Sequence, residues 1–364
     1  MSGLEKKFVK EAFDTNWIAP VGPHINCFEQ ELSKVSQNFF VTVLSSGTAA
    51  IHLSLILAGV KENDDVICSS FTFSASANPI KYLSANPIFI DSEEESWNMC
   101  PKLLETAIKE GIKNNKKPKA IILVHIYGMP AKINEIFEIA NRFNIPVIED
   151  AAEALGSKYN KKQLGTFGEF GVYSFNGNKI ITTSSGGALI SKQKNKIEKA
   201  KFLATQAKNN FHYYEHSEVG YNYRMSNICA AIGLGQLESL SNRVKRKREI
   251  FNFYKKELSM IKDITFLEDS KERFSNYWLT TVVLDKNSII EKDKLRLHLA
   301  QYNIESRFLW KPMHLQPVFK DCKSYINGVS EDLFNRGICL PSGTNLSVED
   351  LDRVVQSIRE LYEI

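Results

Sequence analysis

The sequence predicts an α/β fold with a mostly parallel sheet in a large domain and a smaller C-terminal α/β domain. Two observations predict this fold class. Short apolar runs alternate with helix-period stretches through the first two thirds of the chain, and the pattern changes near residue 240. We therefore expect a large domain over residues 1–240 and a small domain over residues 241–364.

Short runs rich in apolar and β-branched residues predict the strands of the large sheet. Pro, Asn, Lys or acidic residues bound each run, which is typical of strands buried on both faces of a parallel sheet. The expected strands of this kind span residues 64–70, 87–91, 120–125 and 146–150. A further adjoining pair of strands is expected around a Gly-rich corner, at residues 171–175 and 187–191.

Helical periodicity marks the connections between these strands. Residues 48–58 follow Ser-Ser-Gly, and residues 132–143 carry Ile and Ala at helical spacing. The lysine-rich residues 109–119 are expected to form an exposed loop. Alternation of strand and helix predicts βαβ units, with helices on both faces of the sheet.

The last third of the chain carries a separate set of predicted elements. A long helix is expected over residues 236–256, and we interpret its basic run at 243–249 as a solvated face. A closing helix is expected from Ser347, which begins an N-terminal capping arrangement. Between them, strands are expected at residues 264–267 and 278–284 and a helix at residues 292–302.

Composition excludes several classes of protein. The 46 Lys and Arg residues exceed the 42 Asp and Glu residues by a net charge of +4, too small an excess to predict nucleic-acid binding. No run reaches the ~18 apolar residues of a membrane span, and the polar N-terminus differs from a signal peptide. The six cysteines are scattered without metal-ligand spacing. We therefore expect free thiols, no metal, no membrane or nucleic-acid partner and a cytoplasmic location.

Four segments carry residues suited to chemistry. Residues 45–50 open a helix whose N-terminus favours a bound phosphate, although the same residues also suit an ordinary helix cap. Asp150 ends a strand at the edge where α/β folds bind ligands, and small alanines after it leave room for a flat ring. Lys179 follows another strand and is either a surface lysine or a nucleophilic amine. A polar and aromatic segment, residues 220–226, precedes an Ala-rich helix.

Together these segments describe the requirements of pyridoxal 5'-phosphate. This cofactor needs a lysine for its aldehyde, a carboxylate on its pyridine nitrogen and hydrogen-bond donors around its phosphate. The sequence therefore predicts a pyridoxal phosphate enzyme.

With these residues, the chain resembles the sugar-nucleotide aminotransferases of the DegT/DnrJ/EryC1/StrS family over essentially its whole length. The resemblance implies the fold-type-I aminotransferase architecture, a large domain with a mostly parallel sheet plus a smaller α/β domain. The motifs that carry it lie in the family's order, at residues 46–50, 71–73, 149–152, 174–179, 220–226 and 310–314.

The resemblance implies roles for residues around the cofactor ring. Lys179 matches the lysine that holds the cofactor and moves the proton during transamination. Asp150 matches the carboxylate that pairs with the pyridine nitrogen. Phe73 matches an aromatic residue stacked on one ring face and Ala152 the small residue on the other, although Phe73 by itself also suits a core position.

The resemblance also implies phosphate and substrate contacts. Asn222 matches a donor that reaches the phosphate in the neighbouring subunit, which implies a homodimer with shared sites. Arg224 and His314 match positions near the nucleotide-sugar pocket, although His314 by itself also suits a structural role. The matched phosphate donors within the subunit are Gly47, Thr48 and Ser174.

Position 153 departs from the family pattern. Many relatives carry Gln or His there, near the phenolic oxygen of the cofactor, whereas this chain has Glu153. A carboxylate beside a phenolate repels it unless it is protonated or paired. Glu153 is therefore expected either at the cofactor or facing a substrate hydroxyl.

The expected reaction moves the amino group of L-glutamate to the C4 ketone of a nucleotide-linked 4-keto-6-deoxy sugar. Relatives that are dehydratases carry histidine at the lysine position, so Lys179 indicates transamination. The likeness favours UDP-2-acetamido-2,6-dideoxy-4-keto-glucose, with GDP-4-keto-6-deoxymannose or a dTDP-keto sugar as alternatives. A non-catalytic regulator on the same fold is the alternative from another class.

Overall fold

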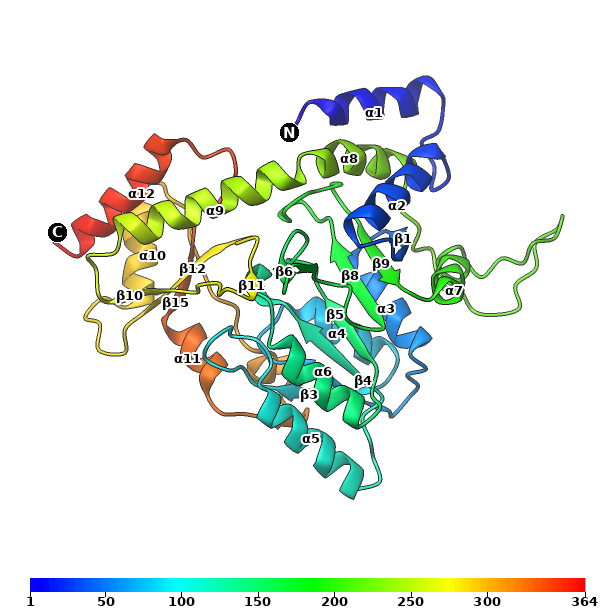
Figure 1. The fold of residues 1–364 in the computed structure, drawn as a ribbon, viewed down its shortest axis with the longest axis horizontal. Helices are drawn as coiled ribbons and strands as arrows, with labels where there is room; N and C mark the ends of the chain where they lie inside the picture. The colour runs from blue at the N-terminus through cyan, green and yellow to red at the C-terminus, as the bar shows by residue number, and fades with distance from the viewer. Residues whose placement is uncertain (364) are drawn as a thin grey trace.

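The large sheet of the protein has eight strands and is mostly parallel, as the computed structural model of residues 1–363 shows (Figure 1). Its strand order is β1-β9-β8-β5-β4-β2-β3-β14. Only β9 runs antiparallel to its neighbours, β1 and β8. The strands are β1 (Phe40–Leu44), β2 (Asp65–Ser69), β3 (Asn86–Ile90), β4 (Ala120–Val124), β5 (Val147–Asp150), β8 (Phe170–Ser174), β9 (Gly187–Ser191) and β14 (Ser324–Tyr325).

Helices cover both faces of this sheet because successive strand residues point to opposite sides. In β2, Val66 and Cys68 pack in the core beneath one helical layer, whereas Ile67 packs in the core on the other face. The first layer contains α3 (Gly47–Leu57), α4 (Ser74–Tyr82) and α7 (Lys194–Ala204). The second contains α2 (Pro23–Val35), α5 (Pro101–Lys113), α6 (Ile133–Arg142) and α8 (Asn227–Glu238).

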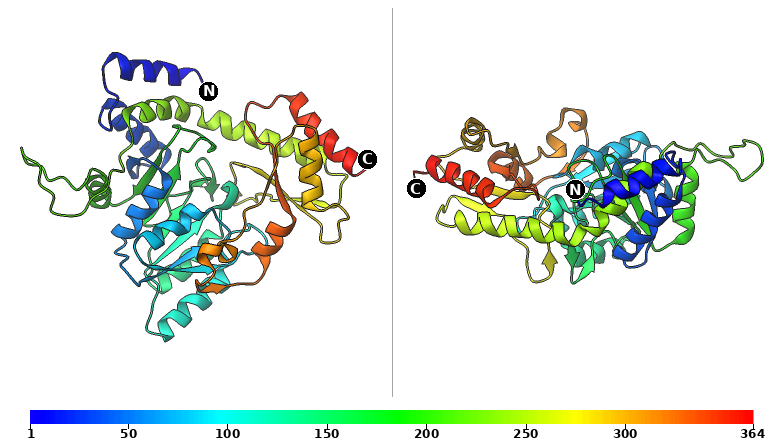
Figure 2. Two further views of the ribbon diagram at one scale, coloured as in Figure 1. Left: turned by 180° about the vertical axis from the view of Figure 1, so that it is seen from behind. Right: turned by 90° about the horizontal axis from the view of Figure 1, so that it is seen from above.

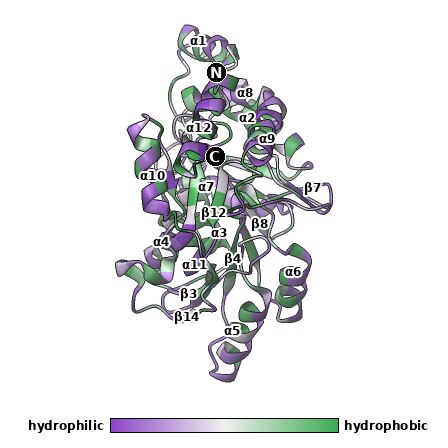
Figure 3. Ribbon diagram, turned by 90° about the vertical axis from the view of Figure 1, so that its left-hand side faces the viewer, coloured by the Kyte–Doolittle hydropathy of each residue, from purple (hydrophilic) through white to green (hydrophobic). Residues whose placement is uncertain are grey.

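The predicted strands and helices of the first two thirds are confirmed, with one exception. The lysine-rich stretch 109–119 was expected to be a loop, but α5 continues to Lys113. The helix persists because Leu104, Ala107, Ile108 and Gly111 form a buried stripe on one side. Figure 3 shows hydrophobic and hydrophilic stretches alternating along α5, so its lysines accompany an apolar stripe instead of interrupting the helix.

The C-terminal third builds a four-stranded antiparallel sheet in the order β10-β12-β15-β13. The long α9 (Leu240–Glu257) runs past it from α8, as Figure 2 also shows. Ser347 caps the closing helix through a capping box with Asp350, as expected. The elements are β10 (Ile264–Phe266), β12 (Thr280–Leu284), α10 (Lys292–Gln301), β13 (Arg307–Phe308), α11 (Val329–Arg336), β15 (Gly337–Leu340) and α12 (Val348–Leu361).

Part of the C-terminal third returns to the large sheet. The strand β14 pairs in parallel with β3. Met313 and Phe319 pack in the same core as α3. The proposed division at residue 240 therefore remains a prediction, and the return of residues 313–325 shows that the two sequence halves interlock.

Smaller elements complete the fold. At the N-terminus, α1 (Leu4–Asp14) packs along α8. A three-stranded sheet in the order β11-β6-β7 lies beside the large one and contains β6 (Lys158–Tyr159), β7 (Lys162–Gln163) and β11 (Arg273–Phe274). Residues 205–226, called the arm below, connect α7 to α8 and project from the body in Figures 1 and 2. Within residues 1–363, no helix combines the length and the apolar character needed to cross a membrane.

Candidate active site

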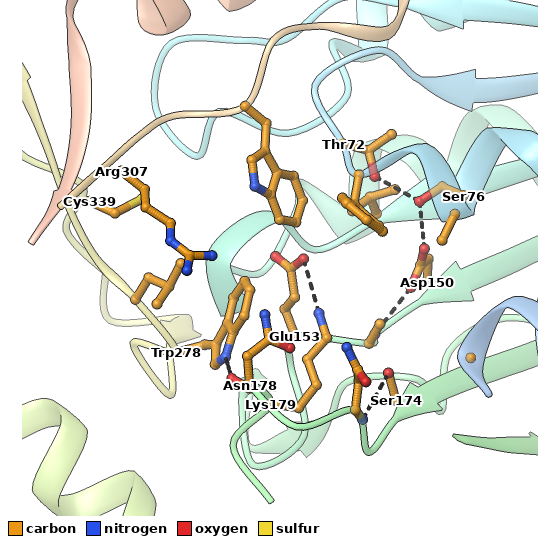
Figure 4. Close-up of a pocket in the computed structure, with 18 of the residues that line it drawn as sticks. Thr72, Ser76, Asp150, Glu153, Ser174, Asn178, Lys179, Trp278, Arg307 and Cys339 are labelled. Carbon is orange, nitrogen blue, oxygen red and sulfur yellow. Dashed lines mark hydrogen bonds and ion pairs between the residues drawn. The ribbon is translucent and has the colours of Figure 1, made fainter. Parts of the chain in front are cut away.

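A cavity of about 470 Å³ opens where the parallel strands of the large sheet end, and Figure 4 shows it in close-up. Residues at the carboxyl ends of β5 and β8 line it, together with the starts of α3 and α4. The C-terminal sheet closes it from the other side through residues 305–308 and 339–342. The carboxyl edge of a parallel sheet is where α/β folds bind ligands.

Lys179 enters this cavity from the connection between β8 and β9. The backbone N–H of Lys179 donates to the carbonyl of Asn176 at 3.0 Å, which turns the loop inward. The Lys179 Nζ lies 3.5 Å from Glu153 Oε1 and 4.2 Å from the centre of the Trp278 ring. With 11% of its side chain exposed, Lys179 is an enclosed amine and not a surface lysine.

Asp150 occupies the end of β5 with its carboxylate held from two sides. Ser76 Oγ donates to Asp150 Oδ2 at 2.6 Å, and the backbone N–H of Ala152 donates to Oδ1 at 3.1 Å. Ser76 is in turn linked to Thr72 Oγ1 at 2.7 Å. Asp150 is buried, and so is the nearby Cys68. The burial of the Cys68 thiol, together with the charge of Asp150, raises the pKa of this thiol. The carboxylate is thus fixed in one orientation.

Glu153 is a second buried carboxyl group in the cavity. Its Oε2 accepts the backbone N–H of Tyr127 at 2.6 Å, and its Oε1 faces Lys179. Burial raises the pKa of Glu153 to about 7, and the charge of Asp150 adds to this, although Lys179 acts in the opposite direction. Glu153 therefore changes protonation near neutral pH, directly beside the amine.

The start of α3 forms a cradle for a small anion. The N–H groups of Gly47 and Thr48 lie in the first turn, where no intrahelical acceptor exists. Ser46 caps the helix by accepting the N–H of Ala49 at 3.0 Å. Glycine is required at position 187 because a Cβ there would lie 2.4 Å from the Gly47 nitrogen. Ser174 also lines this end of the cavity.

The space between these groups suits a flat ring. Phe73, 56% exposed, and Ala152 both line the cavity. The Phe73 ring stands 5.4 Å from that of Trp310. A lysine, a fixed carboxylate and a phosphate cradle around a flat space fit the chemical groups of pyridoxal phosphate.

Three predicted residues lie outside this cavity. Arg224 Nη1 donates to Glu29 Oε1 at 2.9 Å and to Thr42 Oγ1 at 2.8 Å, so its guanidinium is engaged within the chain. His314 bonds Ser70 Oγ at 2.6 Å through Nδ1 and Glu331 at 3.1 Å through Nε2. These contacts are structural, and the substrate roles of Arg224 and His314 remain predictions.

Asn222 is exposed on the arm and does not line the cavity of its own subunit. That placement leaves its amide accessible to another molecule. The shared-site role of Asn222 also remains a prediction.

Several cavity residues were not singled out from the sequence. Ser76 lies inside α4, and the indole N–H of Trp278 donates to the Asn178 carbonyl at 2.7 Å, which holds the ring beside Lys179. Arg307 and Cys339 come from paired positions on β13 and β15. Only Ser76 had a local signal, since it follows the 71–73 motif closely; the others reach the site through tertiary packing.

Comparison with known proteins identifies the family. The sequence pattern of the DegT/DnrJ/EryC1/StrS aminotransferase family matches residues 2–359 of this chain. The chain belongs to this family. It is 50% identical to the protein EpsN of Bacillus subtilis (strain 168), over 100% of this chain and 94% of that protein. It is 40% identical to GDP-perosamine synthase of Escherichia coli O157:H7, over 100% and 96% of the two chains.

A solved structure of a family member agrees with the fold. The family aminotransferase from Brucella abortus superimposes with a TM-score of 0.93 at 28% identity, covering 100% of this chain and 96% of that one. The protein is therefore a pyridoxal phosphate-dependent aminotransferase with the fold expected from the sequence. Its cavity brings together Lys179, Asp150 and the start of α3, which are the kinds of group that this cofactor requires.

Proposed function

We propose that the protein transfers the amino group of L-glutamate to the C4 ketone of a nucleotide-linked 4-keto-6-deoxy sugar. The observation that carries this proposal is the enclosed Lys179 amine facing the same cavity as the fixed Asp150 carboxylate. Pyridoxal phosphate supplies an aldehyde and an electron-withdrawing ring when bound. The remaining chemistry belongs to the residues of this chain.

Lys179 is the proton carrier of the proposed reaction. Its Nζ removes the α-proton of glutamate in the first half-reaction and delivers a proton to C4 of the sugar in the second. Glu153 lies 3.5 Å from this nitrogen, and its pKa of about 7 suits a group that gives or takes a proton near neutral pH. Asp150 is the residue that would hold a protonated ring nitrogen, and Ser76 Oγ and the N–H of Ala152 keep its carboxylate in place by donating to its oxygens.

The GDP-linked 4-keto-6-deoxymannose is the better supported sugar substrate. A relative that shares 40% of its residues over the full length of this chain is named GDP-perosamine synthase. The sequence-based preference for a UDP-linked sugar is the second candidate. It rests on likeness within residues 149–157, 162–170, 174–183 and 310–314. Assaying the GDP-, UDP- and dTDP-linked keto sugars with L-glutamate separates the three.

The Lys179→Ala variant tests the reaction itself. We expect complete loss of turnover and of the yellow colour of the lysine-bound cofactor. Lys201→Ala, on the solvent side of α7, is the matched control and should retain both. Turnover by Lys179→Ala would overturn the proposal. Wild-type protein whose colour is unaffected by glutamate and every keto sugar would favour the non-catalytic regulator.

The proposed working unit is a homodimer with shared sites. The arm carries apolar side chains at high exposure, namely Phe211 at 52%, Tyr213 at 62%, Tyr214 at 80% and Val219 at 84%. Such exposure is typical of an interaction surface. Asn222 at the base of the arm then reaches the phosphate end of the partner site. Replacing Tyr213 and Tyr214 by Ser should lower the mass measured by sedimentation, and an unchanged dimer would remove this support.

A further inference from the structure

The charges that line the cavity are unevenly distributed. Among its described lining residues, the acidic side chains are Asp150, Glu153 and Glu305, and the cations are Lys179 and Arg307. Lys179 is committed to the cofactor and to proton transfer. Arg307 is therefore the one permanent positive charge that this chain offers to an anionic substrate group in the cavity.

Arg307 lies on the side of the cavity opposite Asp150. It is on β13, and Figure 4 shows its guanidinium pointing inward, toward Glu153 and Lys179. Its backbone pairs with Cys339 of β15, another lining residue, so the C-terminal sheet fixes where the side chain starts. The guanidinium can thus face a small molecule that also touches Lys179.

The current partner of Arg307 is easily exchanged. Arg307 Nε and Nη2 both donate to Glu305 Oε1, at 2.9 and 2.7 Å. The side chains of Arg307 and Glu305 are 76% and 75% exposed, so water screens this pair and its net contribution is small. A carboxylate held at the cavity by other contacts would displace Glu305 readily.

A second polar group lies beside Arg307 without a partner. Ser306 also lines the cavity, and its buried Oγ has no hydrogen-bond partner within the described chain. A buried hydroxyl without a partner carries a free-energy cost that a bound acceptor would remove. The guanidinium fork of Arg307 matches the two oxygens of one carboxylate, and the Ser306 hydroxyl belongs to the neighbouring lining residue.

We infer that Arg307, assisted by Ser306, binds the α-carboxylate of the amino donor, and that Glu305 occupies the guanidinium until the donor arrives. The α-carboxylate is attached to the carbon from which Lys179 removes the proton, so its binding group must share the cavity with that amine. Arg307 meets this requirement. This inference rests on the proposed function, in which L-glutamate is the donor.

Binding of unreactive acids to the holoenzyme tests the site without turnover. Glutarate retains both carboxylates of glutamate and lacks its amine, so it binds without reacting. Arg307→Gln should weaken glutarate binding about 100-fold in calorimetry, because one carboxylate loses its guanidinium partner. Arg307→Lys, which keeps the charge without the fork, should lose about tenfold. Equal glutarate binding by wild type and Arg307→Gln would overturn the inference.

Two further variants sharpen the test. Arg296→Gln removes a guanidinium near the Phe308 ring, at 5.4 Å and outside the cavity lining, and should bind glutarate like wild type. Glu305→Gln should bind glutarate about two- to fivefold more tightly, since the competing exposed pair is gone. Weaker binding by Glu305→Gln would contradict its role as a competitor.

The rate of the first half-reaction decides which carboxylate is bound. This rate is followed by cofactor absorbance. The Arg307→Gln variant should react with L-glutamate about 100-fold more slowly than wild type. It should react with 4-aminobutyrate, which lacks the α-carboxylate, at the wild-type rate. Equal slowing of both would assign Arg307 to the distal carboxylate and overturn the inference. A wild-type enzyme that binds glutarate but never reacts with glutamate would refute the proposed donor and leave the Arg307 site standing.

Discussion

Glu153→Gln should make the cofactor-free protein more stable at alkaline pH. Glu153 is buried, and burial raises the pKa of its carboxyl from about 4.5 to about 7. The folded state therefore binds this proton more tightly than the unfolded state. The free energy of unfolding therefore falls as the pH rises from about 4.5, the pKa in the unfolded state, to about 7, the pKa in the folded state. At ~1.4 kcal/mol for each pH unit between these two values, the full loss is about 3 kcal/mol and is reached above pH 7.

Glutamine keeps the shape and the acceptor for the Tyr127 N–H but has no charge to bury. The melting temperatures of variant and wild type should differ least near pH 5. At pH 8 the variant should melt about 4 °C higher than wild type. This figure follows from dividing the loss of about 3 kcal/mol by an unfolding entropy of ~2.1 cal/mol/K per residue. Scanning fluorimetry of the cofactor-free proteins across this range measures the separation.

A matched control removes a carboxylate that water already surrounds. Glu138 pairs with Arg142 on α6 with 73% of its side chain exposed, so Glu138→Gln should follow wild type at every pH. Parallel pH profiles for Glu153→Gln and wild type would refute the reasoning. They would mean that Glu153 ionises in the folded protein as it does in water.

Three further predictions concern the support of the site. Glu149→Gln should lower the free energy of unfolding by about 3 to 5 kcal/mol, as measured by urea unfolding. The reason is that the fully buried carboxylate of Glu149 accepts hydrogen bonds from His125 and from three backbone N–H groups in residues 165–168. A change below ~1 kcal/mol would contradict this. Gly187→Ala should reduce pyridoxal phosphate affinity at least about tenfold in a fluorescence titration, since its Cβ would press on the start of α3; normal affinity would argue against the phosphate cradle. For Glu5, burial raises the pKa of the carboxyl, but the N–H groups of residues 2 and 3 and the Gln236 amide outweigh it and hold the pKa at about 2. Its stabilisation is present above pH ~4.5 and is lost as pH falls toward 2, so hydrogen exchange in α1 should respond to acid in wild type and not in Glu5→Gln.

The sequence predicted those parts of the site that lie on contiguous motifs. Asp150 ends one strand with a clear apolar pattern and Lys179 follows another, so both were expected at the same edge of the sheet, and the structure brings both to one cavity. Periodicity failed at residues 109–113, where lysines suggested a loop. The buried stripe from Leu104 to Gly111 keeps this segment helical, and that stripe is recognised only against the sheet it covers.

Side-chain direction was beyond the reach of motifs. Arg224 and His314 lie on motif segments, yet both are engaged by internal partners outside the cavity. Trp278 and Arg307 carry no local signal and nevertheless line the cavity. Their positions depend on how the C-terminal sheet packs against the large one.

The sequence by itself determined the α/β class, the strand positions, the family and the cofactor, because these follow from local periodicity and from residues grouped in short segments. Only the tertiary structure decided that Glu153 lies 3.5 Å from Lys179 with a pKa near 7, and that Arg307 faces the same cavity. The physical reason is that burial and charge pairing depend on distances between residues far apart in the chain, which packing sets and local pattern does not encode.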